Sequence, residues 1–294
     1  MHWSKISLIG VGLLGGSLGL AIQQRKLASR VEGFVRRSTS IKECEQLGVV
    51  HAAARELAPV VKDADLIILC TPLAQMRELT AQFLPHLKRG AIVTDVGSVK
   101  GSVVAELEKM ITDAGAHFIG SHPMAGSEQT GPGAARADLF EKAICILTPT
   151  PRSSAVALKK VEEFWQAIGA RTLRLTADLH DDFVSRCSHL PHVVAAELAN
   201  YVLSPAHPKE QAMLCANGFR DTTRIASGSP EMWRDIALAN RKNLARVLGV
   251  FIEDLQEFQL ALEHEDSKVV EEFFENARQR RDAWRTPSSN ASSE

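Results

Sequence analysis

The chain has 294 residues and a formal net charge of −1, which is long enough for two domains and gives no reason to expect nucleic acid or an anionic membrane as a partner. No uninterrupted apolar stretch has the length needed to span a bilayer. Five scattered cysteines without a C-x-x-C pair argue against a disulfide framework or a zinc site, and suit a reducing, cytoplasmic compartment.

The first element is a short apolar strand, residues 5–9, that runs directly into the spacing G-x-G-x-x-G. These glycines allow a tight turn and let the backbone approach a pyrophosphate closely, and the N–H groups at the start of the following helix, predicted over 17–24, face that anion. A secretory leader is the alternative, but glycines interrupt its apolar core and no cleavage pattern follows. The residues expected to bind the cofactor in this turn are Gly10, Gly12, Leu13, Leu14 and Gly15.

A second strand over residues 30–35 ends where cofactor choice is decided. NAD-binding proteins place an acidic residue here, on the ribose 2′-hydroxyl. This chain has Val35, followed by Arg36, Arg37 and Ser38. Because guanidinium groups and hydroxyls suit a 2′-phosphate, we expect these side chains to bind the cofactor and favour NADP over NAD; the alternative is that the arginines are merely solvated.

Strands and helices then alternate, which predicts an α/β fold with a doubly wound parallel sheet over residues 1–176. Further strands are predicted at 64–70, 90–96, 117–120, 143–147 and 172–175, with helices at 73–87, 103–114 and 154–168. Ligands of such sheets bind beyond the carboxyl ends of the strands. Four residues that follow those ends are therefore candidates: Thr71 and Pro72 for the cofactor, Ser98 and His122 for chemistry.

From residue 177 no strand pattern appears, and a helical domain is predicted over 177–285. Its elements are a helix over 178–203 interrupted by Pro191, a long helix starting at Pro230 and a last helix over 269–277. The apolar stripes are wide enough to bury part of their surface against a second subunit, so we expect a homodimer. The tail, 286–294, is predicted to be disordered.

Several residues have both a structural and a chemical interpretation. His122 suits proton transfer near neutral pH, Ser98 caps a loop or donates to a substrate oxygen, and Glu128 is a helix cap or a functional carboxylate. His189 and His192 have a spacing compatible with metal, but no third ligand is apparent and no metal is expected. Arg224 and Trp233 are either surface groups or a carboxylate-binding arginine beside an indole.

The motifs GVGLLGGS, DVGSVKG, GSHPMAGSE, SHLPH, GFRDTTRIA and PEMWRDI resemble those of the prephenate/arogenate dehydrogenase family of tyrosine biosynthesis, in the family's order and over nearly the whole chain. The resemblance implies a Rossmann domain followed by an all-helical dimerisation domain. It also implies oxidative decarboxylation of prephenate, or alternatively of arogenate, with hydride transfer to NAD or NADP. Many NAD-using members carry an acidic residue where this chain has Val35.

By this resemblance His122 is the catalytic histidine at the ring C4 hydroxyl, and Ser98 assists there and near the nicotinamide. Arg224 matches the arginine that holds a substrate carboxylate. Further positions that line or gate the substrate pocket are matched by His192, Trp233, Glu128 and Asp181. Two rival interpretations are another two-domain dehydrogenase, such as a β-hydroxyacid dehydrogenase or pyrroline-carboxylate reductase, and a nucleotide-sensing protein without turnover.

Overall fold

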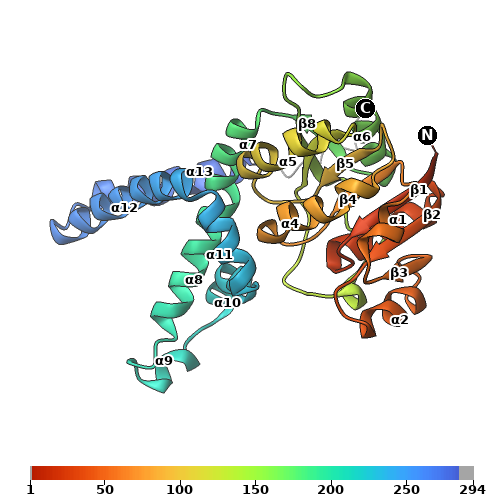
Figure 1. Ribbon diagram of the computed structural model, residues 1–294. Coiled ribbons are helices and arrows are strands. Elements are labelled where there is room, and N and C mark those ends of the chain that lie inside the picture. The colour runs from red at the N-terminus through yellow and green to blue at the C-terminus, as the bar shows by residue number, and fades with distance from the viewer. Residues whose placement is uncertain (1, 285–294) are drawn as a thin grey trace, which may run out of the picture. The chain divides into compact units, whose positions relative to one another are not determined.

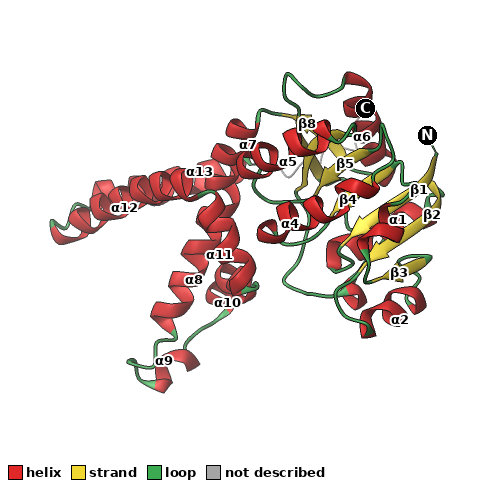
Figure 2. Cartoon of the chain, in the orientation of Figure 1, coloured by secondary structure: helices red, strands yellow, loops and turns green. Residues whose placement is uncertain are grey.

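The computed structural model describes residues 2–284, and its contacts divide the chain into two compact units. One unit ends at Asn240 and the other begins at Arg241. Figure 1 shows the order of the elements along the chain, and Figure 2 shows that every strand belongs to the N-terminal part of the first unit. The predicted tail, 286–294, lies outside the described residues.

The first unit is built on one sheet of eight strands in the order β3-β2-β1-β4-β5-β6-β7-β8. The strands are β1 Trp3–Ile9, β2 Ala28–Phe34, β3 Ala52–Ala54, β4 Leu66–Leu69, β5 Ile92–Asp95, β6 His117–Pro123, β7 Ile144–Thr148 and β8 Arg171–Arg174. The doubly wound α/β fold is confirmed, with two differences. The three-residue strand β3 was not predicted, and β7 runs antiparallel to β6, so the sheet is only mainly parallel.

Helices cover both faces of the sheet, and the side chains of β4 alternate between the two apolar cores that these helices form with the sheet. Leu66 and Ile68 belong to the core that includes residues of α1 and α6, whereas Ile67 and Leu69 belong to the core of α3, α4 and α5. The helices are α1 Leu13–Gln24, α2 Thr39–Gln46, α3 Leu57–Val61, α4 Leu73–Phe83, α5 Gly101–Asp113 and α6 Ala155–Ile168, with 3₁₀ turns Leu84–His86 and Pro132–Ala134.

The first unit continues past the sheet as a set of helices. They are α7 Ala177–Val184, α8 Leu190–Val202, α9 Lys209–Met213, α10 Asn217–Thr223 and α11 Pro230–Ala239, with a 3₁₀ turn Arg224–Ser227. A π-helical turn, Ser185–His189, joins α7 to α8. Pro191 lies in the first turn of α8, where a missing N–H is tolerated, so the proline itself does not break the helix. The predicted interruption corresponds to the π-helical turn just before it.

The second unit contains two helices, α12 Arg241–Glu263 and α13 Ser267–Ala283. The single long helix predicted from Pro230 is in fact α11 and α12, separated at Asn240. Phe258 of α12 packs against Phe273 of α13 with ring centroids 4.4 Å apart. Large apolar side chains nevertheless remain exposed on both helices, including Val250, Leu262 and Phe274. None of the helices in the described part of the chain is both long and apolar enough to cross a membrane.

Candidate active site

The turn between β1 and α1 has the geometry of a phosphate-binding loop. Gly10 has a φ of +99°, which favours glycine, and a Cβ on Gly15 would lie 2.1 Å from the carbonyl oxygen of Gly10. Gly12 is the N-cap of α1 and provides no side-chain cap, while a Cβ built on it would meet nothing within 4 Å. The N-terminal N–H groups of α1 and the open space above Gly12 therefore fit a pyrophosphate.

A second feature at this turn fits a bound nucleotide. Thr71 lies against Gly10, since its Cγ2 would be 2.9 Å from a Cβ added there. Its buried hydroxyl has no hydrogen-bond partner within residues 2–284. Pro72 caps α4 and is exposed. A buried hydroxyl without a partner, next to the glycine turn, is the kind of group that a ligand satisfies.

The end of β2 carries a group of exposed cations. Val35 is only 5% exposed and packs in the core, so its side chain is not available to a ribose. Arg36, Arg37 and Ser38 are exposed. Arg55 joins them, because its Nε donates to the carbonyl oxygen of Arg36 at 3.2 Å. Sequence reasoning missed Arg55, which follows the unpredicted strand β3.

The loop that carries Ser98 is held by a fully buried ion pair. Asp95, the last residue of β5, accepts from the ammonium of Lys100, and both side chains are 0% exposed. Asp95 also accepts from the backbone N–H of Gly97 at 2.8 Å and of Ser121 at 3.1 Å, and Lys100 Nζ donates to the Ser121 carbonyl at 2.8 Å. This network ties the half-buried Ser98 loop to β6 directly before His122.

His122 lies within β6, whereas the sequence predicted it in a loop after this strand. Antiparallel pairing with β7 extends the strand, and His122 stands opposite Ile146. Its side chain is buried, and its Nδ1 lies 2.8 Å from Nε2 of His180 in α7. Burial, together with the neighbouring His180 and Lys100, holds the pKa of His122 well below its ordinary value. The imidazole is therefore neutral at physiological pH and able to accept a proton.

Asp181 connects this histidine pair to the Ser98 loop. Its Oδ1 lies 2.7 Å from Nδ1 of His180 and accepts from the backbone N–H of Lys100 at 2.7 Å. Its Oδ2 accepts from the N–H of Gly101 at 2.8 Å, so that Asp181 satisfies the N-terminus of α5. Asp181 is 6% exposed and contacts His180 of the pair. Its predicted role as a substrate-binding residue stays a prediction.

Two further histidines line the same region from the π-helical turn and α8. Asn240 donates to the carbonyl of Asp181 at 2.8 Å and lies 3.2 Å from Nδ1 of His189, whose buried Nε2 has no partner among the described residues. Burial lowers the pKa of His189 to about 4. His192 stacks on Trp233 with centroids 3.7 Å apart. The structure therefore brings His192 and Trp233 together.

Arg224 and Glu128 also meet. Arg224 Nη1 lies 3.2 Å from Glu128 Oε2, although the two side chains are 62% and 39% exposed. One partner comes from the loop after β6 and the other from the 3₁₀ turn before α11. An exposed pair of this kind is weak and can open for a ligand.

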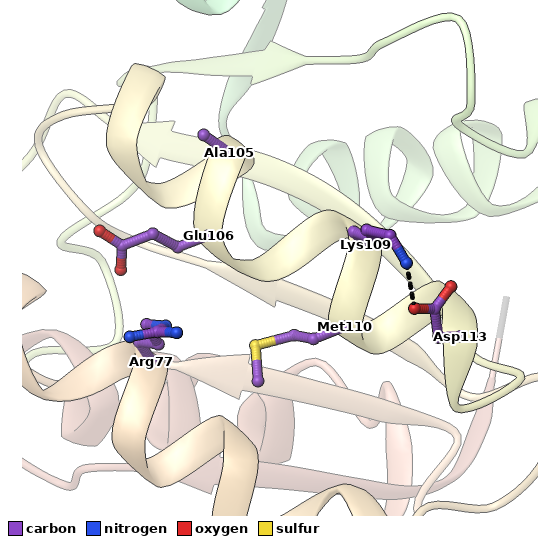
Figure 3. A pocket seen from close by; sticks show the side chains of 6 residues that line it. All are labelled: Arg77, Ala105, Glu106, Lys109, Met110 and Asp113. Carbon is purple, nitrogen blue, oxygen red and sulfur yellow. Dashed lines mark hydrogen bonds and ion pairs between the residues drawn. The ribbon is translucent and has the colours of Figure 1, made fainter.

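A separate hollow of about 390 Å³ lies between α4 and α5, lined by Arg77, Ala105, Glu106, Lys109, Met110 and Asp113 (Figure 3). Its charges balance, and Lys109 pairs with Asp113 at 2.6 Å. None of the predicted site residues lines it, and it contains no buried polar atom without a partner. We assign no chemistry to this hollow. No group of three or more His, Cys, Asp or Glu side chains in residues 2–284 is arranged to hold a metal ion.

The glycine turn at the carboxyl edge of a doubly wound sheet indicates a dinucleotide-binding fold, and the buried His122 at the same edge suits a nucleotide-dependent oxidoreductase that moves a proton. Sequence comparison then identifies the family. The profile of the prephenate dehydrogenase nucleotide-binding domain matches residues 18–174, and that of the prephenate dehydrogenase dimerization domain matches residues 176–278. The chain belongs to the prephenate dehydrogenase family.

Similar proteins agree with this assignment. The chain is 33% identical to the cyclohexadienyl dehydrogenase of Zymomonas mobilis over 97% of both chains, and 34% identical to the prephenate dehydrogenase of Bacillus subtilis over 94% of this chain and 75% of the relative. Its structure resembles that of prephenate dehydrogenase from Aquifex aeolicus in complex with hydroxyphenyl propionate and NAD+, with a TM-score of 0.89 and 29% identity, over 96% of this chain and 98% of the other.

Proposed function

We propose that this chain is a prephenate dehydrogenase, which oxidises and decarboxylates prephenate to 4-hydroxyphenylpyruvate. The observation that carries the proposal is the buried His122 at the carboxyl edge of the sheet, whose pKa burial lowers, and the family assignment supports it. The neutral ring is the form that a general base needs when the substrate's C4 hydroxyl loses its proton.

The cofactor, when bound, accepts the hydride from C4 of the ring. The protein's own part is to hold it and to position the substrate. The turn Gly10–Gly15 and the N-terminus of α1 hold the pyrophosphate, and Thr71 provides a free hydroxyl beside them. His122 takes the hydroxyl proton as hydride leaves, and loss of the ring carboxylate as carbon dioxide makes the ring aromatic and the step irreversible. Ser98, in the loop tied to β6, donates at the same hydroxyl.

Arg224 is the proposed anchor for a substrate carboxylate. In the structure it pairs with Glu128, so a substrate carboxylate replaces Glu128 as its partner on binding. His192 and Trp233, which stack on each other, are the proposed wall of the substrate site. Arogenate differs from prephenate by an ammonium in place of the side-chain keto group, and it remains the alternative substrate. Prephenate is favoured by the names of the relatives from Bacillus subtilis and Lactococcus lactis, which are both called prephenate dehydrogenase.

For the cofactor we propose NADP in preference to NAD. Arg36 and Arg37 follow the end of β2, where a ribose 2′-phosphate is expected, and the Arg55 side chain bonds the backbone there. Val35 offers no carboxylate to a 2′-hydroxyl. The Aquifex structure contains NAD+, so this choice separates the present chain from a similar protein.

We further propose that the protein is a homodimer formed through its helical part. The dimerization-domain profile matches there, and α12 and α13 expose large apolar side chains that an isolated subunit would leave in water. All five cysteines are free thiols, which agrees with a reducing cytoplasm.

The experiment is an initial-rate assay with prephenate or arogenate, each with NAD or NADP, on the wild type and His122→Asn. We expect the highest rate with prephenate and NADP, and a loss of roughly two to four orders of magnitude in kcat for His122→Asn. His51→Gln, a histidine at the edge of the sheet that accepts a backbone N–H from Val31, is the matched control and should retain wild-type turnover. No rate in any combination, or a fully active His122→Asn enzyme, would refute the proposal.

A further inference from the structure

We propose that His180 is a positioning residue that fixes the tautomer of His122, with Asp181 in turn fixing His180. The inference rests on the proposed role of His122 as the base, and deepens it. Its observations are three consecutive polar contacts, from Nδ1 of His122 to Nε2 of His180 at 2.8 Å, from Nδ1 of His180 to Asp181 at 2.7 Å, and from Asp181 to the N-terminus of α5.

The backbone fixes Asp181 as a hydrogen-bond acceptor. Its two oxygens accept from the N–H groups of Lys100 and Gly101, at 2.7 Å and 2.8 Å. A carboxyl group that receives two backbone donors at a helix N-terminus is an ionised acceptor. The contact at 2.7 Å to His180 therefore needs a donor on the imidazole, and the proton of His180 lies on its Nδ1.

The state of His122 then follows. His180 is 0% exposed, and burial lowers its pKa, so the ring is neutral and carries a single proton. With that proton on Nδ1, Nε2 of His180 is an acceptor, and the contact at 2.8 Å needs His122 Nδ1–H as donor. Because the His122 ring is also neutral, its Nε2 has no proton. Nε2 is thus the atom left with a lone pair for the substrate hydroxyl.

The opposite tautomer would place a proton on Nε2 of His122 and leave no atom free to accept one from the substrate. It would also set two acceptors, His122 Nδ1 and His180 Nε2, against each other in a buried site, which is unfavourable. Charged and titratable groups surround the two rings from five elements or their ends: Asp95 at the end of β5, Lys100 before α5, Cys145 on β7, Asp181 on α7 and His189 in the π-helical turn.

The direct test reads the tautomer without turnover. Nitrogen-15 NMR of the histidine-labelled free enzyme, with the His122 signals assigned by their loss in His122→Asn, should show a proton on Nδ1 and a bare Nε2. His180→Phe should lose this preference, because it removes the acceptor, whereas His51→Gln should keep it. A proton on Nε2 of His122 in the wild type would overturn the proposal, whether or not His122 is the base.

Kinetics provides the second readout. His180→Phe should lower kcat by roughly 10²–10⁴-fold, the range for a misplaced general base, with KM for substrate and cofactor nearly unchanged. His180→Gln, whose amide oxygen can accept from His122, should retain more activity than His180→Phe. Equal activity of both variants with the wild type would overturn the proposal.

Discussion

The buried pair of Asp95 and Lys100 leads to a quantitative prediction for the variant Asp95→Asn. Both side chains are fully buried, and the carboxylate receives three donors, from Lys100 Nζ and the N–H groups of Gly97 and Ser121. The amide offers a single acceptor oxygen to these three donors and leaves the ammonium of Lys100 without its paired carboxylate. Breaking a buried pair in this way costs about 3–5 kcal/mol.

For a chain of this size, about 2–4 °C of melting temperature corresponds to each kcal/mol, so we expect Asp95→Asn to melt roughly 6–20 °C below the wild type. The assay is thermal unfolding followed by circular dichroism. The matched control is the double variant Asp95→Asn with Lys100→Met, which removes both charges and should recover a large part of the loss, because the ammonium no longer has to be buried alone. Melting of Asp95→Asn within about 2 °C of the wild type, a shift below the 1 kcal/mol scale, or a double variant less stable than the single one, would refute the reasoning.

Three other predictions concern the substrate anchor, the glycine turn and acid stability. Arg224→Gln should raise KM for prephenate about 10- to 150-fold with little change in kcat, as a charged hydrogen bond is worth about 1.5–3 kcal/mol; an unchanged KM would place the anchor elsewhere. Gly15→Ala should lower stability by about 1–3 kcal/mol because its Cβ meets the Gly10 carbonyl, whereas Gly12→Ala should keep the wild-type melting temperature and weaken cofactor binding in calorimetry. Burial lowers the pKa of His189 to about 4, so as the pH falls the unfolded chain binds a proton at this residue before the folded protein does. The contribution of His189 to the unfolding free energy should be fully present above pH 6.5 and fall by roughly 3 kcal/mol towards pH 4. His189→Gln should flatten this pH dependence of the unfolding free energy.

The sequence was sufficient for the fold class because its signals are local. Continuous apolar runs mark buried strands, and the glycine spacing marks the nucleotide turn. Elements without such a signal were missed: β3 is three alanines, and the direction of β7 depends on how the loop after Pro123 returns to the sheet. Neither feature leaves a periodic pattern in the residues.

The site was predicted unevenly for a similar reason. His122 follows a recognisable strand and motif, whereas His180 is one polar residue within a predicted helix, and only the packing of α7 brings it to 2.8 Å from His122. Lys100 stands in a motif that was noted, but nothing local indicates that its ammonium is fully buried. Partners 58 or 81 residues apart in the chain, as for His122 with His180 and Lys100 with Asp181, become visible only in three dimensions.

The cap that Asp181 places on α5 has a consequence for the independence of the parts of this enzyme. The carboxylate comes from beyond residue 176, yet it completes a helix whose start lies directly after the Ser98 loop. A gene fragment that encoded only the nucleotide-binding part would still carry the glycine turn, but its α5 would begin with unsatisfied N–H groups and its His122 would lack a partner. The nucleotide-binding part therefore depends on two residues from beyond residue 176, Asp181 for the start of α5 and His180 for the contact with His122.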